Sequence, residues 1–280
     1  MGRAKGKKKN YSHRKVLLQS RLLSLAESFA VDIHGFAIMS NHFHVVVRFD
    51  PLESERWSDE EVAQRWIRAF GSPADKESQT RFRNAVDALS RRKRRLGYCR
   101  KRLGCLSAFM QHVKQPIARR ANLEDGVSGH FFEQRFYSGA LLSEKALLAA
   151  MVYVDLNPVR AGITQEIKRL DHTSLSERLR ENCPKKLKSL LQPIAAGINA
   201  PENDSHGPEI TLKQYISLLR DVIAVGRGSS SAHPDSAKQA LRWAQYASLL
   251  SKRQRAFGDV DELSAWLDKR GFRHLEIPFK

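Results

Sequence analysis

The pattern of apolar and polar positions predicts a first helix followed by strands. Within residues 12–29, apolar residues recur at spacings of three and four, which is typical of an amphipathic helix. The next stretch, GFAIMSNHFHVVVRF, is apolar and β-branched, so we expect two strands, or one bent strand, broken near Ser40 and Asn41. Further along, the aromatic residues of HFFEQRFYSGALL, residues 130–142, indicate another strand.

Capping signals and prolines predict three further helices. In WSDEEVAQRWIRAF, Ser58 is the expected N-cap, and Glu61 lies at the capping-box spacing. The segment SAFMQHVKQPIARRAN is helical in pattern, and Pro116 should kink it or mark a boundary. The segment SEKALLAAMVYVDLN should be a helix with Ser143 as its N-cap and Pro158 as its stop.

These elements suggest a core with an insertion and two flanking parts. We expect a basic arm at 1–11, a core at 12–180 with a basic insertion at about 50–105, and a helical C-terminal extension at 181–280. Two Pro/Gly/Ser-rich linkers are expected within the extension, at 199–208 and 226–234.

The amino-acid composition indicates what kind of partner the protein binds. The chain has 280 residues with 48 Lys and Arg against 30 Asp and Glu, a net charge of +18, which indicates a polyanionic partner such as nucleic acid or an anionic membrane surface. Much of the surplus lies between Arg81 and Arg102, where ten basic residues accompany one acid, Asp87. A hydrophobic content of 41% is sufficient for a packed core.

The same composition argues against several other classes of protein. We find no apolar run long enough to span a membrane, and no apolar region follows the charged N-terminus as in a secretory signal. Three cysteines at these spacings fit neither a disulfide framework nor a zinc finger. We therefore expect a protein of the reducing cytoplasm.

Two short motifs could carry chemistry. In an extended strand His42 and His44 would project from one face, which makes them a natural half-site for a divalent metal. On a helix Tyr153 and Asn157 would share a face, and Pro158 places Asn157 at the helix end. Each motif alone also fits an ordinary interpretation: two incidental histidines, and a core tyrosine beside a helix cap.

Taken together, these motifs resemble the single-tyrosine HUH transposases, and within them the bacterial REP-associated tyrosine transposase group. The resemblance covers about residues 15–180, and a weaker similarity at LKQYISLL extends it to about 225. It depends on the following stretches: GFAIMSNHFHVVV, FMQHVKQPIARRANLEDGVSGHFFEQRFYS, LLAAMVYVDLNPVRAGI and DHTSL.

The resemblance implies an α+β fold, in which helices pack on an antiparallel, ferredoxin-like sheet. It implies that His42, His44 and Asn157 bind Mg²⁺ or Mn²⁺ and that Tyr153 is the nucleophile. Attack of this tyrosine on single-stranded or hairpin DNA would leave a 5′-phosphotyrosine and a free 3′-OH. An ordinary tyrosine is almost fully protonated at pH 7, so a cation that polarises the phosphodiester would support the attack.

The basic residues then become candidates for DNA contacts. Arg135 and Arg160 could hold phosphates, although each is equally well explained as a solvated surface arginine. The basic insertion could add phosphate contacts through Arg91, Arg92, Arg94 and Arg95. Trp66 and Tyr98 are possible stacking partners for bases.

The chain departs from the family pattern at its start. Family members usually begin with a strand carrying an H-V-x-x-R sequence, whereas here basic and polar residues lead almost directly into the first helix. Loss of that strand would expose a sheet edge. An active DNA strand transferase therefore competes with a truncated or domesticated relative that binds hairpin DNA without cutting it, and with an unrelated metal-dependent hydrolase. We expect a nucleoid-associated protein, either a monomer or a homodimer, and favour the monomer.

Overall fold

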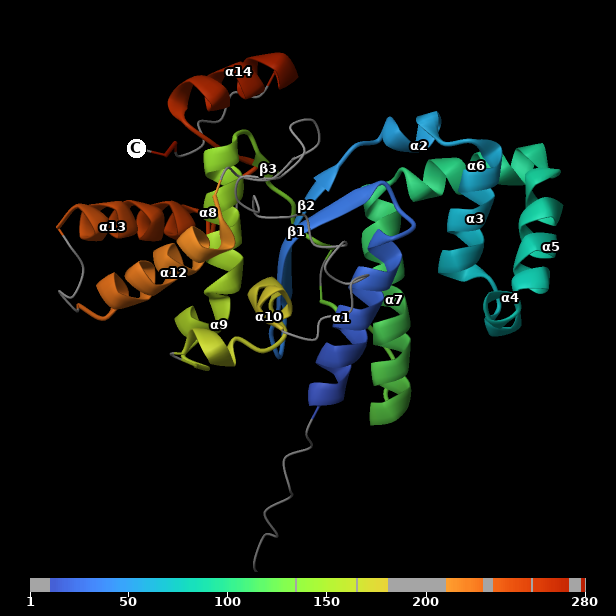
Figure 1. Ribbon diagram of the computed structural model, residues 1–280, viewed down its shortest axis with the longest axis horizontal. Coiled ribbons are helices and arrows are strands. Elements are labelled where there is room, and N and C mark those ends of the chain that lie inside the picture. The colour runs from blue at the N-terminus through green and yellow to red at the C-terminus, as the bar shows by residue number, and fades with distance from the viewer. Residues whose placement is uncertain are drawn as a thin grey trace, which may run out of the picture. The chain divides into compact units, whose positions relative to one another are not determined.

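The computed structural model describes residues 11–133, 135–164, 166–180, 210–228, 234–252, 254–271 and 278–279. The fold is α+β and mostly helical (Figure 1). An antiparallel pair of strands, β1 (Val31–Ile38) and β2 (Phe43–Phe49), accompanies a short parallel pair, β3 (Ala140–Leu141) and β4 (Ala256–Phe257). The predicted break near Ser40 is confirmed, since the chain turns there between β1 and β2.

Two compact units make up the chain. The first comprises residues 1–31, 38–42 and 49–134, and the second comprises 32–37, 43–48 and 135–280. The expected arm at 1–10 and the expected linker at 199–208 lie outside the described residues. Within the described part of the chain, no helix has the length and apolar character needed to cross a membrane.

The first unit contains seven described helices. They are α1 (Ser12–Ala26), α2 (Glu53–Arg56), α3 (Asp59–Phe70), α4 (Pro73–Glu77), α5 (Gln79–Ser90), α6 (Lys93–Leu103) and α7 (Leu106–Asp125). Helix α1 packs along α7, and α3 packs against α5 and α6. The predicted cap of α3 is confirmed, because the Ser58 hydroxyl accepts a hydrogen bond from the backbone N–H of Glu61 at 3.1 Å. The segment predicted as an insertion, at about 50–105, is mainly helical.

Helix α7 continues through Pro116 because a side chain replaces the hydrogen bond that proline removes. Pro116 has no backbone N–H, so the carbonyl of His112, four residues earlier, lacks its helical donor. Arg21 on α1 donates from Nε to this carbonyl oxygen at 3.1 Å. Burial of the Arg21 guanidinium lowers its pKa. Pro116 therefore does not mark a helix boundary. The hydrogen bond from Arg21 to the His112 carbonyl also joins α1 to α7.

The second unit contains the remaining described helices. They are α8 (Glu144–Asp155), α9 (Asn157–Arg160), a 3₁₀ turn (Ile167–Arg169), α10 (Ser174–Leu179), α12 (Leu212–Gly226), α13 (Pro234–Leu249) and α14 (Val260–Arg270). The predicted cap of α8 is confirmed, since the Ser143 hydroxyl accepts from the N–H of Ala146 at 3.3 Å. Helix α8 is almost wholly apolar and buried, and it packs with α12, α13 and β2 in one core that includes Val46, Met151 and Leu219.

The strand predicted at residues 130–142 was wrong except at its end. Only Ala140–Leu141 is a strand, and it pairs with β4. The aromatic residues that suggested a longer strand contact helices instead: the Arg14 guanidinium lies 5.9 Å from the Phe131 ring centre, and the Lys114 ammonium lies 4.6 Å from that of Phe132. Cationic side chains therefore pack near these rings in place of a pairing strand, although Phe131 stays exposed.

The bond between Arg21 and the His112 carbonyl yields a first prediction. Arg21→Ala should lower the free energy of unfolding by about 2 kcal/mol, because a part-buried carbonyl loses a charged donor. In a protein that also carries Pro116→Ala, the restored backbone N–H should recover most of that loss. A double-mutant cycle by chemical unfolding measures both effects. An equal cost of Arg21→Ala with and without Pro116 would contradict this account.

Candidate functional site

Tyr153 lies in the last turn of α8 and contacts two of the other predicted site residues. The ring of His44, on β2, meets the Tyr153 ring edge-on, with 5.3 Å between centres. The guanidinium of Arg160, at the end of α9, lies 5.2 Å from the centre of the same ring. Tyr153 is half-buried and Arg160 is exposed, so the tyrosine lies at the surface of the second unit between an imidazole and a cation.

Asn157 begins the short helix that follows Tyr153. Leu156 separates α8 from α9. Its N–H donates to the Val152 carbonyl, so the backbone stays helical between Tyr153 and Asn157. The predicted end of α8 before Pro158 is confirmed, since α8 ends at Asp155. Pro158 itself lies in the first turn of the short helix α9. Asn157 is buried, and it follows Tyr153 by one helical turn. Its carboxamide oxygen is a kind of ligand that Mg²⁺ and Mn²⁺ accept in proteins.

His42 does not lie in the strand, contrary to the prediction that both imidazoles project from one extended strand. It occupies the turn before β2, where its carbonyl accepts from the N–H of Met39 at 2.9 Å. Its Nδ1 lies 2.7 Å from Oδ1 of Asn41. Because a carboxamide oxygen only accepts, Nδ1 carries the proton, and in the neutral ring Nε2 carries the lone pair that a metal would need.

The described residues contain no group of three or more His, Cys, Asp or Glu side chains placed to hold a metal. The predicted ligand set is different in kind, since it combines two imidazoles with the Asn157 carboxamide. Oxygen ligands suit Mg²⁺ and Mn²⁺, whereas imidazoles suit later transition metals. His44 therefore offers an imidazole and Asn157 a carboxamide oxygen, which together are a mixed set of donors for a divalent cation.

A buried carboxylate that the sequence did not reveal holds this region in place. Asp155, two residues after Tyr153, is fully buried. One oxygen, Oδ1, accepts from the Ser174 hydroxyl at 2.7 Å and from the Leu175 N–H at 3.0 Å, and Oδ2 accepts from the Tyr215 hydroxyl at 2.7 Å. Burial raises the pKa of Asp155, although the nearby charge of Arg178 opposes the shift. Burial, together with the charge of Asp155, also raises the pKa of Tyr215 well above its ordinary value, so the phenol stays protonated and donates.

Four separate sequence motifs meet at this carboxylate. Asp155 belongs to YVDLN, Ser174 to DHTSL and Tyr215 to LKQYISLL. The Ser174 hydroxyl also accepts from the backbone N–H of Phe36, in GFAIMSN, at 3.1 Å. An aspartate inside an apolar helix was the available signal for a buried polar network, but the sequence did not show its partners. The network fixes α8, which carries Tyr153, against β1, α10 and α12.

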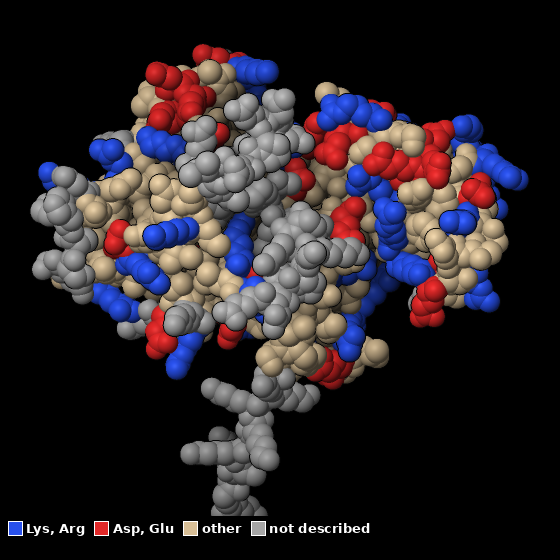
Figure 2. All heavy atoms as spheres, in the orientation of Figure 1, with Lys and Arg blue, Asp and Glu red and all other residues tan. Residues whose placement is uncertain are grey.

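The predicted DNA-binding arginines fall into two groups. Arg135 is exposed in the irregular segment before β3, and the described residues show no contact from it to Tyr153. Arg91, Arg92, Arg94 and Arg95 belong to the first unit, where Arg91 is the C-cap of α5 and the other three lie at the start of α6. Figure 2 shows basic side chains at the surface of this unit. None of these four forms an ion pair with an acidic side chain in the described part of the chain.

Other basic residues of the insertion are structural. Arg100 donates to the backbone oxygens of Ser54 and Trp57, both at 2.6 Å, and to the Asp59 carboxylate at 2.9 Å. Lys93 also donates to Asp59, at 2.6 Å, and these bonds, from Lys93 and then Arg100, lower the pKa of that carboxyl group. These hydrogen bonds from Arg100 join α2, α3 and α6.

Comparison of the chain with protein-family models, with curated proteins and with solved structures finds no match. The functional argument therefore depends on the residues described above.

The Asp155 network generates the second prediction. Asp155→Ala should lower the free energy of unfolding by about 3–5 kcal/mol, because three buried donors lose their acceptor. Asp155→Asn keeps the shape and one acceptor oxygen, which can still accept from the Ser174 hydroxyl and the Leu175 N–H, and its NH₂ group can donate to the Tyr215 oxygen, so it should cost less.

The pH dependence follows from the raised pKa of Asp155. The folded state holds this proton more tightly than the unfolded chain, in which an aspartate titrates near pH 3.9 by general reference. Relative to Asp155→Asn, the wild type should therefore gain stability as the pH falls towards about 4, and lose it as the pH rises through the raised value. Chemical unfolding of both proteins across this range measures the difference. A difference that does not vary with pH would contradict the shift.

Proposed function

We propose that this chain is a metal-dependent DNA strand transferase of the single-tyrosine HUH type, in which Tyr153 is the nucleophile. The observation that carries the proposal is the position of Tyr153, at the surface between the His44 ring and the Arg160 guanidinium. Asn157, which is buried, follows one turn later and supplies a carboxamide. A purely structural tyrosine would not need an exposed cation beside its ring.

The chemistry divides among these residues. The Tyr153 oxygen attacks phosphorus, its proton leaves, and the bond from phosphorus to the 3′ oxygen breaks, so that the 3′ oxygen takes up a proton. The products are a 5′-phosphotyrosine and a free 3′-OH, and the retained bond energy permits rejoining. Arg160, whose guanidinium lies 5.2 Å from the centre of the tyrosine ring, would hold a phosphate oxygen. A divalent cation held by His42, His44 and Asn157 would polarise the scissile phosphate.

The proposal includes the finer features of the resemblance. In it, β1 and β2 are part of the antiparallel, ferredoxin-like sheet of the HUH core, and α8 carries the nucleophile across it. The substrate is single-stranded or hairpin DNA, consistent with the net charge of +18. Residence in the cytoplasm beside the nucleoid and action as a monomer belong to the same proposal.

A second candidate is a relative that binds hairpin DNA without cleaving it. One observation favours it: the antiparallel sheet has two strands in the described part of the chain, fewer than a complete ferredoxin-like sheet. Gel-shift binding of hairpins without Mn²⁺-dependent cleavage would support this candidate. Cleavage products that appear with Mn²⁺ and disappear with a chelator would exclude it.

The third prediction tests the nucleophile. With Mn²⁺ and a panel of hairpins carrying single-stranded flanks, the wild type should form a covalent protein–DNA adduct that survives denaturing electrophoresis. Tyr153→Phe should abolish the adduct, because the phenyl ring keeps the packing against His44 but has no attacking oxygen. The matched control is Tyr137→Phe, which alters an exposed tyrosine of the same unit and should retain the adduct. Adduct formation by Tyr153→Phe would disprove the assignment.

A further inference from the structure

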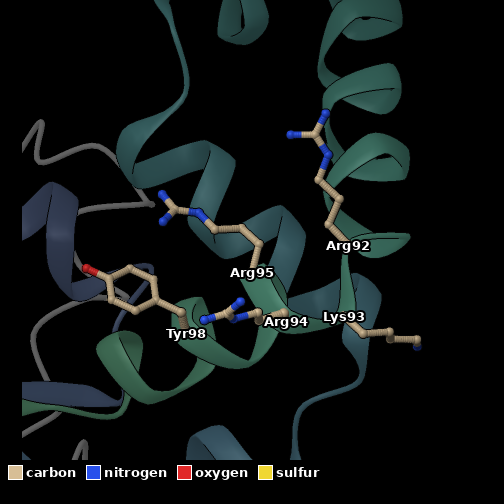
Figure 3. Close-up of a pocket in the computed structure, with 5 residues that line it drawn as sticks. All are labelled: Arg92, Lys93, Arg94, Arg95 and Tyr98. Carbon is tan, nitrogen blue, oxygen red and sulfur yellow. The ribbon is translucent and has the colours of Figure 1, made fainter.

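The first unit carries a hollow of about 570 Å³ at the start of α6, lined by Arg92, Lys93, Arg94, Arg95 and Tyr98 (Figure 3). We propose that this hollow is a second nucleic-acid site, in which Tyr98 and Arg95 stack on an unpaired base while Arg92 and Arg94 bind the adjoining phosphates. The inference rests on the proposed function for its ligand class, a DNA strand. It goes further by naming a place, outside the tyrosine site, where unpaired nucleotides are held.

The aromatic part of the site is already assembled. The Tyr98 side chain is 48% exposed, which is high for an aromatic residue within a helix. The Arg95 guanidinium lies 4.9 Å from the centre of the Tyr98 ring and 5.6 Å from that of Trp66. The two rings meet edge-on, with 6.1 Å between centres. The Tyr98 ring is thereby supported on one side and leaves surface for a base, whose planar face stacks on aromatic rings and guanidinium groups.

Two arginines at the hollow, Arg92 and Arg94, have no folding role in the described part of the chain, whereas Arg95 also packs on Tyr98 and Trp66. Asp59 pairs with Lys93 and Arg100, whereas Arg92, Arg94 and Arg95 have no acidic partner within the described residues. Lys93, Arg94 and Arg95 also form the first turn of α6, where the helix dipole favours acidic residues and disfavours basic ones. These charges therefore reduce the stability of α6, a cost that a bound phosphate would offset.

The shape and chemistry of the hollow specify unpaired nucleotides. In Figure 3, Arg94, Arg95 and Tyr98 point to the same side of α6, whereas Lys93 points away from Tyr98. The volume lies within the range of about 300–1,000 Å³ that is usual for small-ligand pockets. A duplex presents its phosphates to such a surface but keeps its base faces stacked, so only a single strand or an unpaired flank can use Tyr98.

The experiment compares binding of a short oligothymidine with binding of a blunt duplex of the same length, by fluorescence anisotropy at fixed salt. All proteins are full-length and carry Tyr153→Phe, so covalent attachment does not contribute. Adding Tyr98→Ala should weaken oligothymidine binding about tenfold, the loss expected for one stacked base, and change duplex binding by less than about twofold. Adding Tyr98→Phe, which keeps the ring, should preserve both affinities.

Two further variants separate stacking from charge and from folding. Arg119→Ala with Arg120→Ala removes two exposed arginines of α7 and should weaken single-strand and duplex binding by the same factor. Arg94→Glu places an acid in the first turn of α6, so it should weaken oligothymidine binding while the melting temperature stays equal or rises. Oligothymidine affinity within twofold of the parent for Tyr98→Ala, or for Arg94→Glu, would overturn the proposal.

The outcomes also separate this inference from the proposed function. If oligothymidine binding depends on Tyr98, but the protein with Tyr153 intact forms no adduct, the second site is supported and only the strand-transfer assignment is overturned. Adduct formation together with unaltered binding by Tyr98→Ala would overturn only the second site. A parent protein that binds neither oligonucleotide would overturn both.

Discussion

The Asp155 carboxylate is the interaction on which the second unit depends. An ionised carboxylate without water is unfavourable unless its oxygens are fully hydrogen-bonded, and here three donors from two other segments supply those bonds. Because Ser174 also accepts from the N–H of Phe36, the network reaches β1 as well. Apolar packing alone permits a helix to slide or rotate, whereas directional bonds to one buried charge fix a single register of α8. The position of Tyr153 beside His44 therefore follows from a carboxylate that contacts neither of these two side chains.

The sequence predicted the elements whose signals are local. The caps at Ser58 and Ser143 and the break between β1 and β2 depend on residues close together in the chain, and the structure confirms them. The grouping of Tyr153 with Asn157 also came from a local signal, because residues four apart in a helix are neighbours. The contact of Tyr153 with His44, by contrast, was expected only from a family resemblance, since no spacing rule joins residues so far apart.

What the sequence did not reveal depends on partners distant in the chain. Pro116 indicated a boundary because its missing N–H is visible in the sequence, whereas the replacement donor, Arg21, lies on another helix. The aromatic residues around Phe131 suggested a strand because their contacts with Arg14 and Lys114 are also non-local. The basic run from Arg81 to Arg102 looked uniform, yet Arg100 is bonded to the backbone while Arg94 has no acidic partner within the described chain. Charge counting could not separate these roles.

Tyr153 and Asp155 are neighbours in sequence but serve separate purposes. The carboxylate network includes no atom of Tyr153. The half-buried phenol therefore takes no part in the hydrogen bonds through which Asp155 holds α8. If Tyr153 is the nucleophile, as proposed, then its loss and the loss of the fold are independent events. Under that proposal, a lineage that lost the tyrosine hydroxyl would keep its scaffold and its basic surface, and would pass from a strand transferase to a DNA-binding protein without an unstable intermediate.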